Sequence, residues 1–232
     1  MKAKPMIFNT EMVKALLDGR KTVTRRPLNI PGGWELHDRK LSKITSSHPK
    51  KGKWGALVRK GVGTDFPQSN LVTAPCFVDD LIWVRETFQG PLFDQEMERE
   101  YWENKDKFND PKYCTYAATD PKPEFYDITT ERLVSRWTPS IHMPKWASRL
   151  TLRVADVRIE RVKDITEEQA IKEGVTPYQD TNKPLENPHR YSFLRLWCDL
   201  YGTDNPNPYV WVIEFEVIHK NINDVLAELE AI

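Results

Sequence analysis

Four stretches of the chain carry apolar residues at helical spacing. In residues 10–18 an apolar stripe follows Thr10, which is expected to be the N-cap, and Gly19 is expected to end the helix. Residues 166–169 read Thr-Glu-Glu-Gln, the spacing of a capping box, and predict a short helix that runs to Glu173. Two more helices are predicted over residues 191–201 and 223–230.

Four other stretches have the pattern of strands. Residues 81–86 are apolar on both faces, which predicts a central or well-covered strand, and residues 209–217 carry the strongest strand signal. Residues 149–162 alternate between apolar and polar with a phase change at Ala155-Asp156, which indicates a bulge or bend. Residues 113–118 are expected to form an edge strand. Strands and short helices in mixed order, with no regular βαβ alternation, predict an α+β or small-barrel fold.

Two regions interrupt these patterns. Residues 28–75 are rich in Pro, Gly, Ser and Lys and are expected to form an irregular basic insertion. Residues 89–112 are acidic and aromatic and predict a short surface helix within a second insertion over 89–132. We therefore expect one domain over residues 1–220, with a helical tail over 221–232.

Composition excludes several classes of protein. The chain has 232 residues, with 39% hydrophobic and 29% charged, which is typical of a globular chain with a real core and excludes disordered or collagen-like sequences. No stretch approaches the roughly 20 apolar residues that span a bilayer, and no signal-peptide region develops at the start. We therefore expect a cytoplasmic protein that has no membrane partner. Its three distant Cys residues (76, 114 and 198) are expected to be reduced.

The net charge of zero hides an asymmetry. Residues 1–75 hold 15 Lys and Arg against 5 Asp and Glu, and residues 76–232 hold 19 against 29. A basic region on a neutral protein creates a local positive field that attracts phosphate. The alternative is that the two oppositely charged regions attract each other.

Several common ligand motifs are missing from the sequence. It contains no glycine-rich phosphate-binding loop of the GxxxxGK[ST] or GxGxxG type. Its five His residues (37, 48, 142, 189 and 219) lack the spacing of metal ligands. We expect neither a metal nor a cofactor.

The densest chemical feature lies just after the first helix. Arg20, Lys21, Arg25 and Arg26 place four cations within seven positions. The negative end of the preceding helix dipole favours Arg20 and Lys21, but the whole group repels itself unless something negative lies nearby. One candidate is the phosphate of a nucleotide or nucleic acid. The other is an internal carboxylate partner, with Glu86 or Glu173 in that role.

The same segment places a lysine near a threonine. A Lys21 amine whose pKa is lowered by burial or by neighbouring cations is able to act as general base for the Thr24 hydroxyl. A carboxylate that orients the lysine, binds a substrate amine or relays a proton would complete this catalytic set. Backbone N–H groups would stabilise the oxyanion that forms on the substrate. The alternative is that the threonines of this segment are ordinary strand formers.

Eight Trp residues are a heavy aromatic load for this length. Trp34 and Trp54 fall in the basic insertion, where tryptophans close to cations make platforms for base stacking. The alternative is that each of them anchors its loop on the core.

Together these segments resemble the ASCH domain of the larger bacterial and phage type. The resemblance implies the PUA-like fold, a small bent β-barrel flanked by helices, with a cleft that in relatives handles RNA or modified nucleobases. It covers both ends of the chain and leaves the two insertions unmatched. The matching segments are Phe8-Asn9-Thr10-Glu11-Met12-Val13, Gly19 to Pro27, Asp80 to Glu86, Glu173-Gly174-Val175 and Trp211 to Phe215.

One bacterial branch of this superfamily hydrolyses acetylcytidine to cytidine and acetate. Its reactive Lys, Thr and Glu correspond by resemblance to Lys21, Thr24 and Glu173, which are the expected catalytic residues. The expected ligand is a nucleoside, a nucleotide or single-stranded nucleic acid. One alternative is a protein that binds RNA or modified nucleic acid without catalytic activity, and another is a ribonuclease. The residues expected to bind the ligand are Arg20, Arg25, Arg26, Arg85, Glu86, Trp34 and Trp54.

Overall fold

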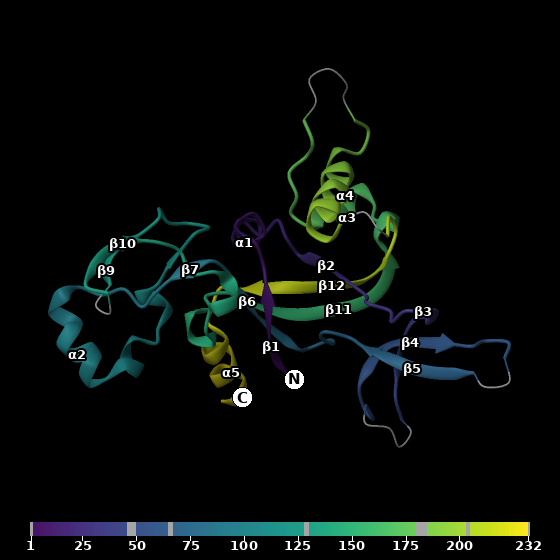
Figure 1. The fold of residues 1–232 in the computed structure, drawn as a ribbon, viewed down its shortest axis with the longest axis horizontal. Helices are drawn as coiled ribbons and strands as arrows, with labels where there is room; N and C mark the ends of the chain where they lie inside the picture. Colours follow the sequence, from purple (N-terminus) through teal and green to yellow (C-terminus); the bar gives the residue numbers. More distant parts are fainter. Residues whose placement is uncertain are drawn as a thin grey trace. The chain divides into compact units, whose positions relative to one another are not determined.

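The structure, a computed structural model, describes residues 2–45, 50–64, 67–127, 130–179, 185–202 and 205–231. His48 and part of the Pro- and Asn-rich stretch before residue 188 lie outside the described residues. The chain divides into two compact units (Figure 1). Unit 1 comprises residues 1–19, 80–153 and 216–232, and unit 2 comprises residues 20–79 and 154–215. The predicted domain limit at residue 220 stays a prediction.

The sheet of unit 1 is built around β6 (Leu81–Arg85), the strand predicted to be central. β1 (Ala3–Ile7) pairs with it in parallel, and the first three residues of β11 (Thr151–Arg161) pair with it antiparallel. Leu81 and Ile82 are fully buried, as a strand covered on both faces requires.

Two helices complete this part of unit 1. α1 (Thr10–Leu17) is capped by Asn9, whose side chain accepts a hydrogen bond from the Met12 N–H, so the prediction of Thr10 as N-cap is wrong by one residue. α5 (Ile222–Glu230) is capped by Asn221 and packs Ile222 and Val225 against Leu81.

The second insertion also belongs to unit 1. The predicted surface helix is confirmed as α2 (Glu98–Glu103), and the predicted edge strand is reduced to β8 (Thr115–Tyr116). β8 pairs with β7 (Phe88–Gln89), and β9 (Glu124–Asp127) forms a hairpin with β10 (Arg132–Ser135). Five 3-10 turns connect these elements: Gln95–Met97, Lys105–Phe108, Pro111–Tyr113, Ser140–His142 and Lys145–Ala147.

Unit 2 contains β2 (Val23–Pro27), which pairs antiparallel with β12 (Tyr209–Ile218), and β12 lies next to β11. The burial of β11 changes phase between Val154 and Val157, as the sequence predicts. A 3-10 turn (Val162–Asp164) follows β11.

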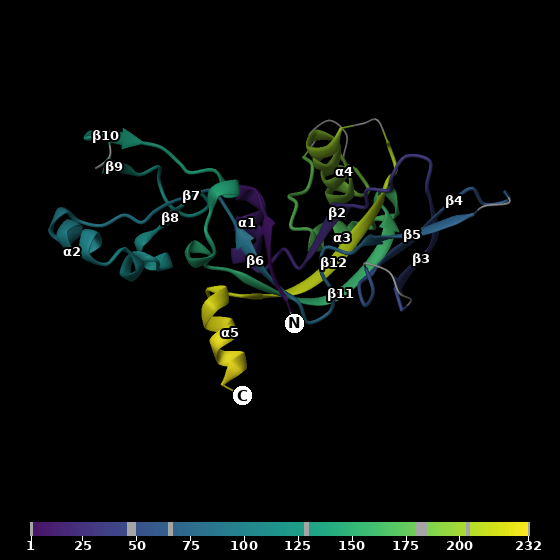
Figure 2. The same ribbon diagram turned by 60° about the horizontal axis from the view of Figure 1, so that its bottom comes forward.

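Two helices cover this sheet. α3 (Glu167–Lys172) has the predicted capping box, and α4 (Pro188–Tyr201) begins three residues before the predicted start because Pro188 occupies its first turn. They lie together on one side of β2 and β12 (Figures 1 and 2). Their core joins Val23, Val210 and Val212 to Phe193 and Trp197.

The basic insertion is not irregular, which corrects the prediction for residues 28–75. β3 (Glu35–Lys43), β4 (Trp54–Lys60) and β5 (Gln68–Thr73) form an antiparallel sheet in unit 2. A Cβ atom at Gly55 would lie 2.1 Å from the Val72 carbonyl oxygen, so the pairing of β4 with β5 needs glycine there.

The mixed α+β class is thus confirmed, while no sheet closes into a barrel among the strands described. Within the described ranges, no helix combines the length and the apolar character that crossing a membrane requires.

Candidate functional site

The cation-rich segment packs against the C-terminal end of α3. The Arg20 Nη1 donates to the Gly174 carbonyl at 2.9 Å, and the Thr22 N–H donates to the Lys172 carbonyl at 2.9 Å. Between them, the Lys21 Nζ donates to the Glu173 carbonyl at 2.9 Å. The last carbonyls of a helix have no partners within it and form the negative end of its dipole. The segment therefore caps α3.

Lys21 is fully buried, and all three N–H groups of its ammonium have acceptors. Besides the Glu173 carbonyl, Nζ donates to the Glu173 Oε2 at 2.7 Å and to the Val23 carbonyl at 2.8 Å. Glu173 is 4% exposed. Lys21 and Glu173 are 152 residues apart in the chain, so this buried ion pair is a product of the fold.

Arg25 shares the same carboxylate. Its Nη1 donates to the Glu173 Oε1 at 3.1 Å, and its Nη2 donates to Glu160 and to the Gln169 side-chain oxygen, each at 2.9 Å. Lys21, Arg25, Glu160 and Glu173 therefore balance two positive charges with two negative ones. Of the two partners left open by the sequence, an external phosphate or an internal carboxylate, the structure gives Lys21 and Arg25 the internal carboxylate Glu173.

The pKa of Lys21 is lowered. Burial has the largest effect because it removes the charged amine from water, and the nearby positive charges of Arg26 and Arg25 lower the pKa further. The charge and hydrogen bond of Glu173 oppose this effect. The neutral amine, which is the form a general base requires, is therefore easier to reach than in an exposed lysine.

Thr24 lies close to this pair along the chain and is 2% exposed. In a continuous extended strand, Lys21 and Thr24 would face opposite sides. Here β2 begins only at Val23, so Lys21 lies before the strand and the alternation of side chains along β2 does not fix the direction of its side chain. The hydrogen bond to the Val23 carbonyl brings the Lys21 amine to the peptide unit that precedes Thr24.

Arg85 and Glu86, two of the predicted binding residues, belong to unit 1 and have partners there. Both oxygens of the buried Glu86 accept hydrogen bonds from Arg149 at 2.9 Å, and Arg85 donates to the Ile141 carbonyl. Burial raises the pKa of Glu86, and Arg149 opposes that shift. These hydrogen bonds hold both residues to other parts of unit 1.

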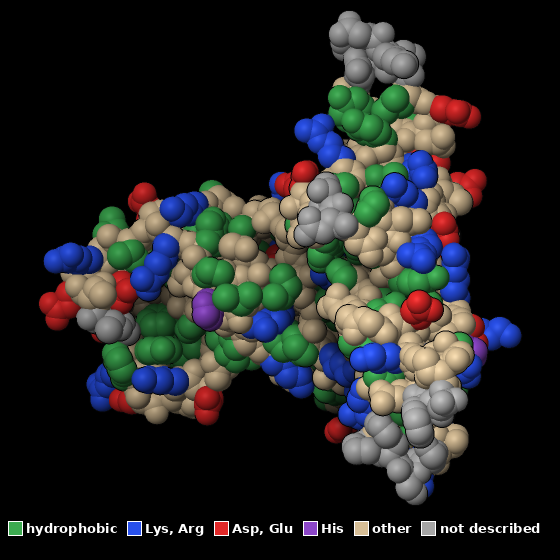
Figure 3. Space-filling model, turned by 45° about the vertical axis from the view of Figure 1, so that its right-hand side comes forward, with side chains coloured by type: hydrophobic (Ala, Val, Ile, Leu, Met, Phe, Trp, Pro, Cys, Tyr) green, Lys and Arg blue, Asp and Glu red, His purple; other side chains and the backbone are tan. Residues whose placement is uncertain are grey.

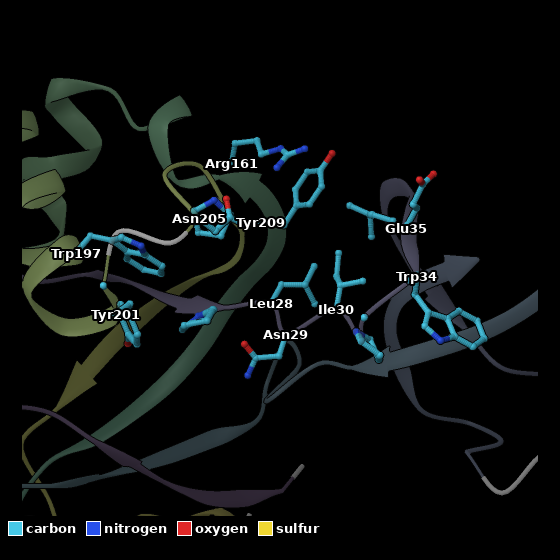
Figure 4. Close-up of a pocket in the computed structure, with 17 residues that line it drawn as sticks. Leu28, Asn29, Ile30, Trp34, Glu35, Arg161, Trp197, Tyr201, Asn205 and Tyr209 are labelled. Atoms are coloured by element: carbon cyan, nitrogen blue, oxygen red, sulfur yellow. The ribbon is translucent and has the colours of Figure 1, made fainter. Parts of the chain in front are cut away.

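The two predicted stacking tryptophans have different surroundings. Trp54 stacks on Phe77 with ring centroids 4.8 Å apart, and the Lys43 amine lies 5.7 Å from its ring centroid, an arrangement that fits the alternative of an anchoring role. Trp34 instead lines a cavity of about 870 Å³ in unit 2 (Figure 4).

The sequence did not predict this cavity. Its walls come from the segment 27–36, from the end of α4 and from the start of β12. Residues 34 and 209 lie far apart in the chain, and only Trp34 stood out as a candidate in the sequence. Trp197 belongs to the hydrophobic core of unit 2 and also lines the cavity, and its place in a helical stripe indicates only the first of these.

The basic stretch keeps many cations at the surface. Arg39, Lys40, Lys43, Lys53 and Lys60 are exposed, and Lys and Arg side chains recur over the right-hand part of Figure 3, which holds unit 2. Arg39 pairs with Asp164 at 2.8 Å. That pair links the basic third of the sequence to its acidic remainder, as the alternative explanation of the charge asymmetry expects.

No group of three or more His, Cys, Asp or Glu side chains could hold a metal ion in the part of the chain that the structure describes. Comparisons with protein-family models, with curated proteins and with solved structures found no match.

Proposed function

We propose that unit 2 hydrolyses an N-acylated nucleobase, with N4-acetylcytidine as the first substrate to test. The observation that supports this proposal is the buried 2.7 Å contact between the Lys21 amine and the Glu173 carboxylate, with the buried Thr24 three residues after Lys21 in the chain. These are the three positions that the resemblance to the acetylcytidine-hydrolysing ASCH branch marks as reactive. The PUA-like fold is part of the same proposal, and the α+β class agrees with it.

Each of the three residues has a distinct role in the proposed reaction. The Thr24 oxygen attacks the acyl carbonyl carbon while the neutral Lys21 amine takes the hydroxyl proton. The C–N bond of the amide then breaks, and Lys21 returns the proton to the departing amine of cytosine. Water, deprotonated in turn by Lys21, then attacks the acyl carbon, the ester bond to the Thr24 oxygen breaks, and Lys21 returns the proton to that oxygen as acetate leaves. Glu173 holds the lysine in place throughout.

The burial of these residues sets a condition for this reaction. Lys21, Thr24 and Glu173 are all at most 4% exposed, so neighbouring side chains have to move when a substrate enters. Lys21 also has to release one of its three acceptors before it takes up a proton. The Val23 carbonyl is the acceptor nearest Thr24 along the chain, so this hydrogen bond is the one we expect to open.

Substitutions of Thr24 test the proposal with little disturbance of the fold. Thr24→Val keeps the shape and removes the nucleophile, and Thr24→Ser keeps the hydroxyl. We expect cytidine release from acetylcytidine, followed by liquid chromatography and mass spectrometry, in the wild type and in Thr24→Ser but not in Thr24→Val. Lys21→Met is expected to lower kcat by about 10²–10⁴-fold.

Two results would remove the proposal. One is the absence of cytidine release from the wild-type protein, and the other is equal rates in Thr24→Val and the wild type. Single-stranded RNA is a parallel substrate in the same assay. If it is cleaved while acetylcytidine remains intact, the ribonuclease alternative replaces the hydrolase.

A further inference from the structure

The cavity of unit 2 is a concave site separate from the Lys21 cluster. Its volume of about 870 Å³ lies in the range of about 300–1,000 Å³ that small-molecule sites occupy. Lys21, Thr24 and Glu173 are not among its lining residues. The segment 27–36 that supplies one wall lies almost entirely in the stretch that the ASCH resemblance leaves unmatched.

Aromatic rings from different elements line the cavity. Trp197 and Tyr201 come from α4, and their ring centroids lie 4.4 Å apart. In Figure 4, Leu28 and Ile30 lie between Trp197 at one end and Trp34 at the other. Trp34 is only partly buried. A ring in that position is available to stack on a flat ligand.

Arg161 adds a second flat surface. Its guanidinium lies over the Tyr209 ring, 3.6 Å from the centroid, and the two side chains are seen together in Figure 4. One guanidinium nitrogen, Nη1, donates to the Asn207 carbonyl at 2.8 Å. Arginine presents five N–H donors in a plane, so further donors remain for a ligand.

The charge of the lining argues against a polyphosphate as the main ligand. Arg161 is the cation and Glu35 the anion among the lining residues, and the other polar side chains include the amides of Asn29 and Asn205. A site for polyphosphate gathers several cations. Amides, one guanidinium and aromatic faces instead suit a neutral, flat heterocycle with donors and acceptors at its edge.

We propose that this cavity binds a nucleobase, presented either by a free nucleoside or by an unpaired base of a single strand. Trp34 supplies the stacking face, and Arg161 with the two amides supplies hydrogen bonds to the edge of the base. The site is argued from the cavity alone, and the choice of cytidine as first probe rests on the proposed function.

Titrations with nucleosides and a ten-residue oligonucleotide test this proposal. The protein is Thr24→Val, which lacks the proposed nucleophile, so binding is measured apart from hydrolysis. We expect cytidine to bind in isothermal titration calorimetry and Trp34→Ala to weaken binding about 5- to 150-fold, because base stacking is worth about 1–3 kcal/mol. Trp34→Phe should recover part of the loss.

Trp102→Ala is the matched control. Trp102 is 55% exposed, lies in unit 1 and does not line the cavity, so the same change there should leave binding unaltered. If the nucleoside and the oligonucleotide bind equally well per base, the free nucleoside is the source of the base. If only the oligonucleotide binds, and Trp34→Ala weakens it, the source is a single strand.

The proposal is overturned by any of three results. These are no binding of either probe at millimolar concentration, equal binding by Trp34→Ala and Trp102→Ala, and a preference for simple sugars over nucleosides. Hydrolysis of acetylcytidine by the Trp34→Ala protein, measured separately, shows whether the proposed function stands when this site fails.

Discussion

Removal of the Glu173 carboxylate should destabilise the protein strongly. In Glu173→Ala, the Lys21 ammonium keeps the carbonyls of residues 23 and 173 as acceptors but loses its only carboxylate within hydrogen-bond distance among the described residues. Arg25 keeps Glu160 and Gln169. The uncompensated charge therefore falls mainly on Lys21, which is fully buried.

Breaking one partner of a buried ion pair lowers the free energy of unfolding by about 3–5 kcal/mol. Native proteins are stable by about 5–15 kcal/mol, so Glu173→Ala removes a large part of the total. In urea, with a slope of about 3 kcal/mol per molar, the midpoint should fall by about 1 M or more. Tryptophan fluorescence reports the transition, since Trp197 and Trp211 are buried in unit 2.

A double variant separates stability from chemistry. Replacing a buried ion pair by apolar side chains of similar volume is often neutral or stabilising, so Lys21→Met combined with Glu173→Leu should recover most of the lost stability. It should still release no cytidine. A midpoint shift below about 0.3 M in Glu173→Ala would refute this account of the cluster, because it would mean that Lys21 finds water or another anion at no cost.

Three further predictions concern stability elsewhere. The Glu167 carboxylate accepts the backbone N–H groups of residues 189 and 190 in the first turn of α4, at 2.9 and 2.8 Å, so Glu167→Ala should lower the free energy of unfolding by about 1 kcal/mol in urea titrations. Because the pKa of Glu86 in the folded state is raised above 4.5, the folded state holds a proton on this carboxyl at pH values at which the unfolded chain has lost it. The free energy of unfolding of the wild type should therefore fall as the pH rises from 4.5 through the pKa of the folded state, and Glu86→Gln should flatten this pH dependence. The Asn221 side chain donates to the carbonyls of Lys145 and Trp146 and caps α5, so Asn221→Ala should lower the thermal midpoint by several degrees, and an unchanged midpoint would show that these hydrogen bonds contribute little.

Local patterns were sufficient for much of the fold. The capping box of α3, the apolar run of β6 and the phase change within β11 are all set by residues a few positions apart, and each is confirmed. The start of α1 was misplaced because Asn9 and Thr10 are both good capping residues, and only the backbone decides between them.

The sheet of β3, β4 and β5 was missed for a physical reason. β3 has only two large aliphatic residues, Leu36 and Leu41, and most of its remaining positions are exposed and polar. β4 contributes small buried residues such as Gly55 and Ala56. The alternation of hydrophobic and polar residues is weak in these strands. The sheet is therefore identified by the backbone pairing of neighbouring strands, and not by the pattern of apolar residues.

The candidate site shows where sequence reasoning ends. Crowded cations require nearby negative charge, and that argument limits the internal partners to a few carboxylates. The choice of Glu173 depends on the fold that brings the end of α3 to residues 20–22. Glu86 met the same sequence criteria but pairs with Arg149 in unit 1.

The two roles of Lys21 make opposite demands on its proton, and pH separates them. As an ammonium, Lys21 satisfies three acceptors, and as a neutral amine it serves as the proposed base. Its pKa in the folded state lies below 10.5, the ordinary value that applies to the unfolded chain, mainly because of burial. Between these two pKa values the unfolded chain holds a proton on Lys21 that the folded protein has released. Stability should therefore rise with pH through that window, and the rate of acetylcytidine hydrolysis should rise with it as the neutral amine forms. Subtracting the profile of Lys21→Met isolates the contribution of this group, and an identical pH slope of stability in the two proteins would show that Lys21 keeps an ordinary pKa and is no candidate for the base.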